Sequence, residues 1–293
     1  MHDGKQVVSI EKSDCGATLT TWLYCNMWQL YAAEQMGMLG LISWPQKWNR
    51  SLTPYQDPAM FAQIPNMYDW YFKQPHVPTG TACEHRWEWE THPATGLHVL
   101  MGQPLDDIKA FYQKHLKFSA AVEARGQALA AKHSVNFSKT IGLTWRGTDC
   151  VTDGRPRMPI EVYYPWIDEM LVAEPDLRIA ATAEEEGILA PLLARYPSAF
   201  VISEFIAAPA GAMQNPEKIR HDISGFERGM VPALMVWFFS RCAHYIKNRS
   251  SSGAVASWLS TGNIVCLGHA ETLSYELIPD QAEHKGKRFP LRR

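Results

Sequence analysis

Residues 141–149 have the sequence Ile-Gly-Leu-Thr-Trp-Arg-Gly-Thr-Asp, an apolar run that ends in charged and turn-forming residues. The apolar part predicts a buried β-strand over residues 140–144, with Arg146 at its carboxyl end. Ligands of open α/β sheets bind at that end, and an arginine there can bind a phosphate through two N–H groups. We therefore predict an anion site at Arg146. Asp149 could orient this arginine, cap the turn or accept a proton, or the pair could only hold the loop.

Strands and helices alternate on both sides of this stretch. Towards the C-terminus, the pattern predicts strands over 177–182, 199–203, 243–247 and 263–267 and helices over 159–172, 184–195, 229–242 and 252–259. Towards the N-terminus, it predicts a strand over 7–10, a helix over 22–37, a strand over 39–44 and a helical region over 104–133. This alternation is typical of doubly wound parallel sheets. The sequence predicts an α/β fold with two Rossmann-like domains, 1–135 and 136–293, whose parallel sheets face a central cleft.

The composition argues against several classes of protein. Of the 293 residues, 46% are hydrophobic and 20% are charged, which excludes a disordered chain. A net charge of −2 argues against a broad nucleic-acid-binding face. The six cysteines form no Cys-x-x-Cys pair, which argues against a zinc site or a disulfide framework. The longest apolar run, residues 229–239, is shorter than the roughly 20 residues of a membrane span.

The two ends of the chain bear on its location. The first residues lack the apolar segment of a signal peptide, so we expect a cytoplasmic protein. The C-terminal segment 285–293 is basic. It is either a loosely packed tail or a weak contact with an anionic membrane surface.

A second candidate anion site lies within residues 240–253, where a predicted strand runs into Ser250, Ser251 and Ser252 and then a helix. Hydroxyls and backbone N–H groups at a helix N-terminus can bind an anion, although serine is also a common N-cap. The chain has no Gly-x-Gly-x-x-Gly or Walker motif and no Asp-x-Asp pair. Many metal-dependent sugar transferases bind the diphosphate of their donor through an Asp-x-Asp pair. Its absence makes a metal-dependent sugar transferase less expected.

Together these segments resemble the GT-B fucosyltransferase family, of the α1,6 (Nod-factor) and protein O-fucosyltransferase types. The family has, in order, a His-x-Arg-(Arg/Gly)-x-Asp strand end, a Pro-Ile-Glu-x-Tyr helix, an Ala-Thr-Asp strand end, a basic-Gly to Ser-Arg-Cys helix and a serine turn. The matching segments are residues 144–149, 159–163, 181–184, 228–242 and 250–252.

The resemblance implies a GDP-fucose donor held mainly by the C-terminal domain and a metal-independent, inverting transfer to a glycan acceptor, with no further cofactor. By position, Arg146 would neutralise the β-phosphate of the departing GDP. The three serines would hold the diphosphate or the guanine. The other donor-side positions are Gly16, Thr144, Thr182, Glu184 and Arg228.

A base for the acceptor hydroxyl is expected from Asp153, in the loop after the arginine motif, or from Asp149. A fucosyl-type transition state is cation-like and needs little help from a base. The acceptor region is expected within residues 45–100, where residues 85–90 alternate aromatic and acidic side chains. The alternative for that segment is a strand whose tryptophans lie in the core.

Three positions depart from the family pattern. Thr144 replaces the histidine, Gly147 replaces the second arginine of many members, and Met235 replaces an aspartate that contacts the nucleotide. These departures leave two alternative functions. One is a non-catalytic glycan- or nucleotide-binding protein on the same fold, and the other is a transferase with a different nucleotide sugar.

Overall fold

The structure is a computed structural model that describes residues 2–11, 19–44, 55–74, 76–78, 81–83, 85–87, 105–145, 159–183, 187–206, 223–248 and 250–267. The chain forms two compact units. The first comprises Met1–Arg125 and Ser224–Leu234, and the second comprises Gly126–Ile223 and Met235–Arg293. The expected domain limits and the cleft between the domains stay predictions. None of the described helices is long and apolar enough to cross a membrane.

The first unit is built on a β-α-β element. Strand β1 (Val7–Glu11) leads to helix α1 (Leu19–Gln35) and to strand β2 (Leu39–Ser43), which pairs with β1 in parallel. Strand β4 (His85–Trp87) pairs with the other edge of β1, so that β1 is central and all its residues are buried. The predicted strand, helix and strand are confirmed within a few residues. The segment 85–87 is a strand whose tryptophan is buried.

Short elements complete this unit. They are α2 (Pro58–Gln63), α3 (Tyr68–Tyr71), β3 (Phe72–Lys73), α5 (Leu105–His115) and β5 (Lys117–Phe118). Strand β5 pairs antiparallel with β3 and separates α5 from the next helix, so the expected continuous helical region over 104–133 is wrong at this point. Cross-strand pairing here overrides the helical pattern of the sequence.

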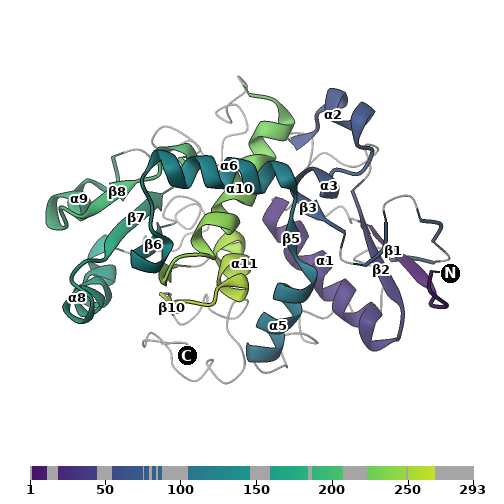
Figure 1. The fold of residues 1–293 in the computed structure, drawn as a ribbon, viewed down its shortest axis with the longest axis horizontal. Coiled ribbons are helices and arrows are strands. Elements are labelled where there is room, and N and C mark those ends of the chain that lie inside the picture. The colour runs from purple at the N-terminus through teal and green to yellow at the C-terminus, as the bar shows by residue number, and fades with distance from the viewer. Residues whose placement is uncertain are drawn as a thin grey trace. The chain divides into compact units, whose positions relative to one another are not determined.

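Five parallel strands form the sheet of the second unit, in the order β10-β9-β6-β7-β8 (Figure 1). These strands are β6 (Thr140–Trp145), β7 (Arg178–Ala183), β8 (Ala199–Val201), β9 (His244–Lys247) and β10 (Asn263–Cys266). Every neighbouring pair is parallel. The predicted α/β fold with parallel sheets is therefore confirmed.

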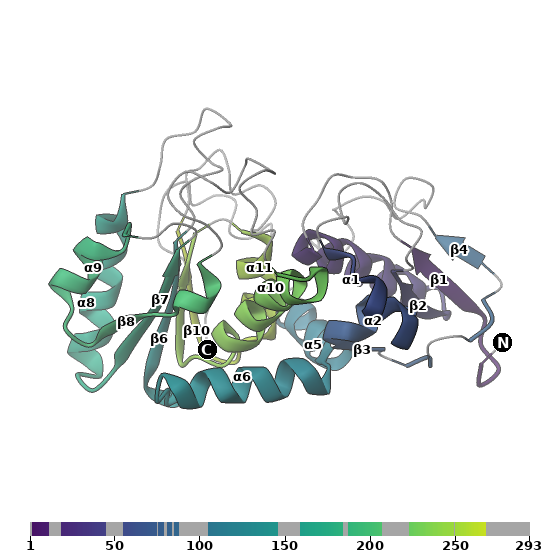
Figure 2. The same ribbon diagram turned by 90° about the horizontal axis from the view of Figure 1, so that it is seen from above.

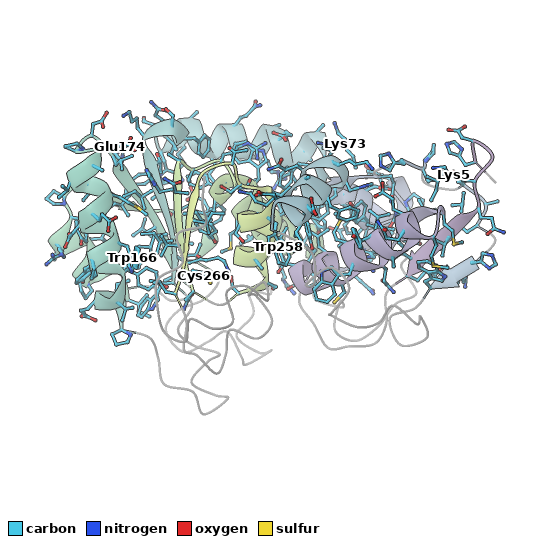
Figure 3. The ribbon with its side chains drawn as sticks, turned by 90° about the horizontal axis from the view of Figure 1, so that it is seen from below. Lys5, Lys73, Trp166, Glu174, Trp258 and Cys266 are labelled. Atoms are coloured by element: carbon cyan, nitrogen blue, oxygen red, sulfur yellow. The ribbon has the colours of Figure 1, made fainter. Side chains whose placement is uncertain are left out.

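Helices cover both faces of this sheet (Figure 2). Helices α8 (Tyr164–Ala173) and α9 (Ala190–Arg195) lie on one face, and α11 (Ser251–Leu259) lies on the other. Figure 3 shows Trp166 of α8 and Trp258 of α11 on opposite sides of the strands. Two further helices, α6 (Ala120–Lys132) and α10 (Gly225–Phe239), each contain a boundary between the two units.

The side chains of β6 alternate between these faces. Ile141, Leu143 and Trp145 belong to the apolar core beneath α8 and α9. On the opposite face, a Cβ on Gly142 would lie 2.7 Å from Cδ1 of Phe239 and 3.0 Å from Sγ of Cys242. A larger residue at 142 would therefore push away the end of α10 and the turn that leads into β9.

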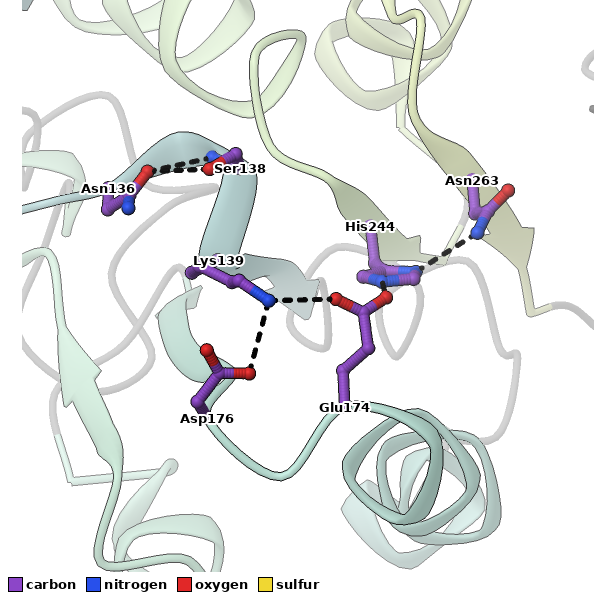
Figure 4. A network of polar contacts seen from close by, with 7 residues as sticks. All are labelled: Asn136, Ser138, Lys139, Glu174, Asp176, His244 and Asn263. Atoms are coloured by element: carbon purple, nitrogen blue, oxygen red, sulfur yellow. Dashed lines mark hydrogen bonds and ion pairs between the residues drawn. The ribbon is translucent and has the colours of Figure 1, made fainter.

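A polar network ties together the amino ends of the strands (Figure 4). Lys139 Nζ lies 3.4 Å from Glu174 Oε2 and 3.2 Å from Asp176 Oδ1. His244 Nε2 lies 3.3 Å from Glu174 Oε1, and its Nδ1 lies 3.3 Å from the amide nitrogen of Asn263. Because the amide nitrogen can only donate, Nδ1 accepts and Nε2–H donates to Glu174. Lysine and histidine both satisfy Glu174, so we interpret this end as structural.

A buried histidine makes the stability of the first unit depend on pH. His115 is 1% exposed, and its Nε2 lies 2.8 Å from Glu34 Oε2, which also pairs with Lys114. Burial lowers the pKa of His115 to about 4, and the charge of Glu34 opposes this only in part. An unfolded histidine has a pKa of about 6.5, so between these values the unfolded chain binds more protons than the folded one. The free energy of unfolding is therefore expected to fall by about 2 kcal/mol from pH 7 to pH 5 through this residue.

Urea unfolding at both pH values measures this effect. The variant His115→Gln should lose about 2 kcal/mol of the difference between the two pH values, because glutamine does not titrate. The matched control is His85→Gln, at an exposed histidine of β4, which measures the effect of the same substitution away from the buried site. An unchanged pH dependence in His115→Gln would contradict the prediction.

Candidate functional site

The candidate site lies at the carboxyl ends of β6, β7 and β9 in the second unit. Strand β6 comes first in this sheet along the chain, and its neighbours are β7 on one side and β9 on the other. The connections therefore run in opposite directions from β6, and the switch in strand order falls between β6 and β9. Ligands of open α/β sheets bind outside the carboxyl ends at such a switch point.

Three polar side chains form a row across these strand ends. Thr144 of β6 is the register partner of Thr182 on β7 and of Lys247 on β9. Register partners in a parallel sheet point to the same face, which here is the face opposite the α8 and α9 core. All three residues are buried, with exposed fractions of 6%, 1% and 2% respectively.

Hydrogen bonds fix Thr144 at the centre of this row. Its Oγ1 lies 3.0 Å from the hydroxyl of Tyr245, and the hydroxyl of Tyr163 donates to its carbonyl oxygen at 3.2 Å. Tyr245 in turn stacks on Phe239, with ring centroids 5.3 Å apart and an angle of 13° between the ring planes. The packing of α10 thus holds the central strand end in place.

Helix α11 begins beside this row. Ser250 is its N-cap, with φ −163° and ψ 148°, and its Oγ accepts the N–H of Gly253 at 2.8 Å. Ser251 and Ser252 form the first turn and are partly exposed. A helix N-terminus carries a partial positive charge and favours anions.

One polar atom of the row lacks a hydrogen-bond partner. Within the described residues, the hydroxyl oxygen of Thr182 is buried and makes no hydrogen bond. Buried hydroxyls in folded proteins are nearly always hydrogen-bonded, so an exception at a strand end is a sign of a ligand site. By contrast, burial raises the pKa of the Cys242 thiol on the same face, so this thiol packs as an apolar group.

The structure describes six of the predicted site residues. Thr144 and Thr182 are brought side by side, and the three serines open α11 as predicted. Arg228 lies in the first turn of α10, in the part that belongs to the first unit. Burial raises the pKa of the Tyr55 phenol, and the nearby charge of Arg228 opposes this rise only in part.

The remaining predicted site residues lie outside the described residues. These are Gly16, Arg146, Asp149, Asp153 and Glu184. Arg146 directly follows Trp145, the last residue of β6. The described residues contain no group of three or more His, Cys, Asp or Glu side chains that could hold a metal ion.

Sequence reasoning missed Lys247 and Tyr245 as members of this site. Both lie within residues 240–253, where the predicted anion site consists of the three serines and residues 243–247 are predicted only as a strand. The available signal was a charged residue at the end of an otherwise apolar strand. Its position beside Thr144 depends on strand pairing across about a hundred residues, which a local pattern does not give.

The fold of this chain is similar to that of a solved fucosyltransferase structure. No protein-family model and no curated protein matches this sequence. Among solved structures, a FUT1 variant from Arabidopsis thaliana in complex with GDP matches with a TM-score of 0.52 and 10% identity, over 91% of this chain and 71% of that one.

Two further solved structures match with TM-scores under 0.5. NodZ α-1,6-fucosyltransferase soaked with GDP-fucose has a TM-score of 0.49 and 14% identity, over 93% of this chain and 97% of that one. POFUT1 in complex with GDP-fucose has a TM-score of 0.46 and 7% identity, over 89% of this chain and 96% of that one. The chain thus has a mixed α/β fold with parallel sheets that is similar to that of FUT1.

Proposed function

We propose that this chain is a glycosyltransferase of the fucosyltransferase type, with GDP-fucose as donor and a hydroxyl of a glycan or glycoconjugate as acceptor. One observation carries the proposal. A buried row of two threonines and a lysine adjoins the N-terminus of α11 at the switch point of a sheet, in a fold that is shared with a GDP-bound fucosyltransferase. Lysine, hydroxyls and a helix N-terminus together suit a nucleoside diphosphate.

In the proposed reaction, the leaving group is the diphosphate of GDP, and it takes up negative charge. The acceptor oxygen forms a bond to the anomeric carbon as the bond from that carbon to the diphosphate oxygen breaks, and the electron pair leaves with GDP. The acceptor proton passes to a base, for which Asp153 and then Asp149 are the proposed residues. Attack from the side opposite the leaving group inverts the anomeric centre.

Positive groups of the protein would stabilise the charge that grows on the diphosphate. We assign this role to Arg146 and to the N-terminus of α11, so that transfer needs no metal ion. Preorganised donors of this kind are usually the largest single term in catalysis. The buried hydroxyl of Thr182 would donate a hydrogen bond to the GDP part of the donor.

Thermal unfolding with nucleotides tests the donor. GDP or GDP-fucose at 100 times its Kd is expected to add about 2.7 kcal/mol to the free energy of unfolding. At roughly 2–4 °C per kcal/mol, this is a shift of about 5–10 °C. GDP-mannose, UDP and UDP-glucose at the same concentration serve as matched ligands.

The pattern of shifts decides between the candidate functions. A shift with GDP and not with UDP supports the proposed donor, and a shift with UDP alone contradicts it. A protein that binds GDP but releases none from GDP-fucose with any glycan would be a binding protein. Met235 on α10, where the family has an aspartate that contacts the nucleotide, is the observation that keeps this second function open.

A further inference from the structure

We propose that Glu11 and Arg86 bind neighbouring hydroxyls of a neutral sugar of the acceptor, at the carboxyl end of the first sheet. This inference rests on the proposed function, because it names residues of the first unit that hold the acceptor of that reaction. The expected acceptor region is residues 45–100, and Glu11 lies outside it. The pair therefore includes a residue that the sequence pattern does not assign.

Glu11 and Arg86 lie on the two strands that meet at the switch point of the first sheet. The strand order is β2-β1-β4, and β1 comes first along the chain. The chain therefore passes from β1 to β2 on one side and reaches β4 on the other. Glu11 is the last residue of β1, and Arg86 is the middle residue of β4. Ligands of open α/β sheets bind outside the carboxyl ends of the strands at such a point.

Both side chains lie on the face of the sheet that α1 does not cover. A Cβ on Gly40 would lie 2.5 Å from a leucine side chain of α1 and 2.7 Å from Ile10 Cδ1, so Ile10 faces α1. Glu11, the next residue, faces the other side. Ser9 also faces that side, and it is the register partner of Arg86.

The carboxylate of Glu11 is buried, but only one of its oxygens has a partner. Its side chain is 6% exposed. Oε1 accepts a hydrogen bond from the Ser9 hydroxyl at 3.0 Å and lies 3.1 Å from Arg86 Nε. Oε2 has no hydrogen-bond or ion-pair partner among the described residues. Burial of a carboxylate is costly unless it is paired and hydrogen-bonded, so the free oxygen is a sign of a ligand.

Arg86 supplies hydrogen-bond donors beside this acceptor. Its side chain is 76% exposed, and in the described part of the chain Nε makes its one ion pair. The Nη groups therefore keep their N–H donors for a ligand. The Arg125–Glu227 pair of the same unit is different, because two guanidinium nitrogens there donate to both carboxylate oxygens. By comparison, the Glu11–Arg86 pair leaves an acceptor and several donors open.

An acceptor and a donor side by side match two neighbouring hydroxyls of a sugar. One hydroxyl would donate to Glu11 Oε2, and the next would accept from an Nη group of Arg86. Ser43, the register partner of Glu11, is partly exposed on the same face and offers a further hydroxyl. The carboxylate disfavours an anion here, and the guanidinium group disfavours a cation. A neutral polyhydroxyl compound therefore fits this pair best.

Binding of oligosaccharides to the whole protein tests the proposal. An array of neutral and acidic oligosaccharides first identifies the compound that the wild-type protein binds most strongly, and this compound is the probe for titration. Glu11→Gln is expected to weaken its binding by roughly 10- to 100-fold, which is typical of a lost hydrogen bond to a charged group. The affinity for GDP, whose proposed site is in the second unit, should change by less than about 3-fold.

Deoxy analogues of the probe, each lacking one hydroxyl, show whether the contact is direct. Removal of the hydroxyl that Glu11 holds should weaken binding to the wild-type protein. The same removal should have little further effect on Glu11→Gln, because that interaction is already lost. An indirect, structural effect of the substitution would instead add to the loss from every analogue.

Two further variants separate binding from folding. Arg86→Lys keeps the positive charge beside Glu11 but lacks the forked N–H donors, so it should weaken binding of the probe by about 3- to 10-fold. Because Arg86 is exposed, this variant is expected to fold, and it decides the question with the deoxy analogues if Glu11→Gln does not fold. Glu34→Gln removes a carboxylate at the end of α1, before β2 begins, and should leave binding of the probe unchanged.

Each outcome has one meaning. A loss of affinity for the probe that is non-additive with one deoxy analogue supports the assignment. Wild-type affinity in the variants, additive losses with every analogue, or an array on which no neutral oligosaccharide binds overturns it while the proposed donor stands. Failure of the wild-type protein to bind GDP overturns the proposed function, and with it the role of the bound sugar as acceptor.

Discussion

Arg146→Ala is expected to lower the rate of GDP release from GDP-fucose by about 10²–10³. Arg146 follows directly on β6, the central strand of the second sheet, at the end where such sheets bind their ligands. Its neighbour on that strand end, Thr144, is held by two tyrosines. Side-chain hydrogen bonds therefore hold the strand end where the leaving diphosphate is proposed to bind. A guanidinium group there would stabilise the departing charge better than solvent does.

The measurement is GDP release in the presence of a panel of glycans, with the affinity for GDP determined alongside. A large loss of turnover with a smaller loss of GDP affinity would show that the arginine acts mainly in the transition state. The matched control is Arg178→Ala, at the first residue of β7 and thus at the other end of the sheet. Arg178 packs over Phe200 and donates to Ser134, so this control can lose stability but should keep its turnover. Wild-type turnover in Arg146→Ala would contradict the assignment.

The sheet of the second unit could be predicted because its apolar runs are short and clearly bounded. The predicted limits of β6 and β10 are each within one residue of the observed ones. The limits of helices were predicted less well. Helix α9 begins at Ala190, after Gly187, whose φ of +74° cannot continue a helix. Helix α10 begins four residues before the predicted start, at Gly225, because the charged Glu227 and Arg228 in its first turn separate this turn from the apolar run.

The residues of the candidate site could be predicted only where they lie at a strand end or helix start that the local sequence pattern marks. Thr144, Thr182 and Ser250 stand at ends of strands or at a helix start, which a local pattern shows. The partnership of Thr144 with Lys247 needs the register between strands that are far apart in sequence. A sequence pattern fixes which face a side chain takes along its own strand, but not which residue of another strand lies beside it.

Phe239→Ala is expected to lower the free energy of unfolding of the second unit by about 3–5 kcal/mol. Phe239 is 1% exposed, stacks on Tyr245 and touches Phe238 at a centroid distance of 5.3 Å. It also lies against Gly142, where no side chain can fill the space that a truncation leaves. The loss therefore combines the transfer of an aromatic ring with the cost of a cavity under the central strand.

The same substitution should weaken donor binding, although Phe239 touches none of the proposed ligand groups. Tyr245 loses the ring on which it stacks, and its hydroxyl then holds Thr144 less firmly. Urea unfolding and GDP titration on the folded variant measure the two effects separately. Val172→Ala, at a valine that is 83% exposed on α8, is the control and should change stability by less than about 0.5 kcal/mol. A folded Phe239→Ala protein with wild-type GDP affinity would mean that packing beneath β9 stabilises the unit without positioning the site.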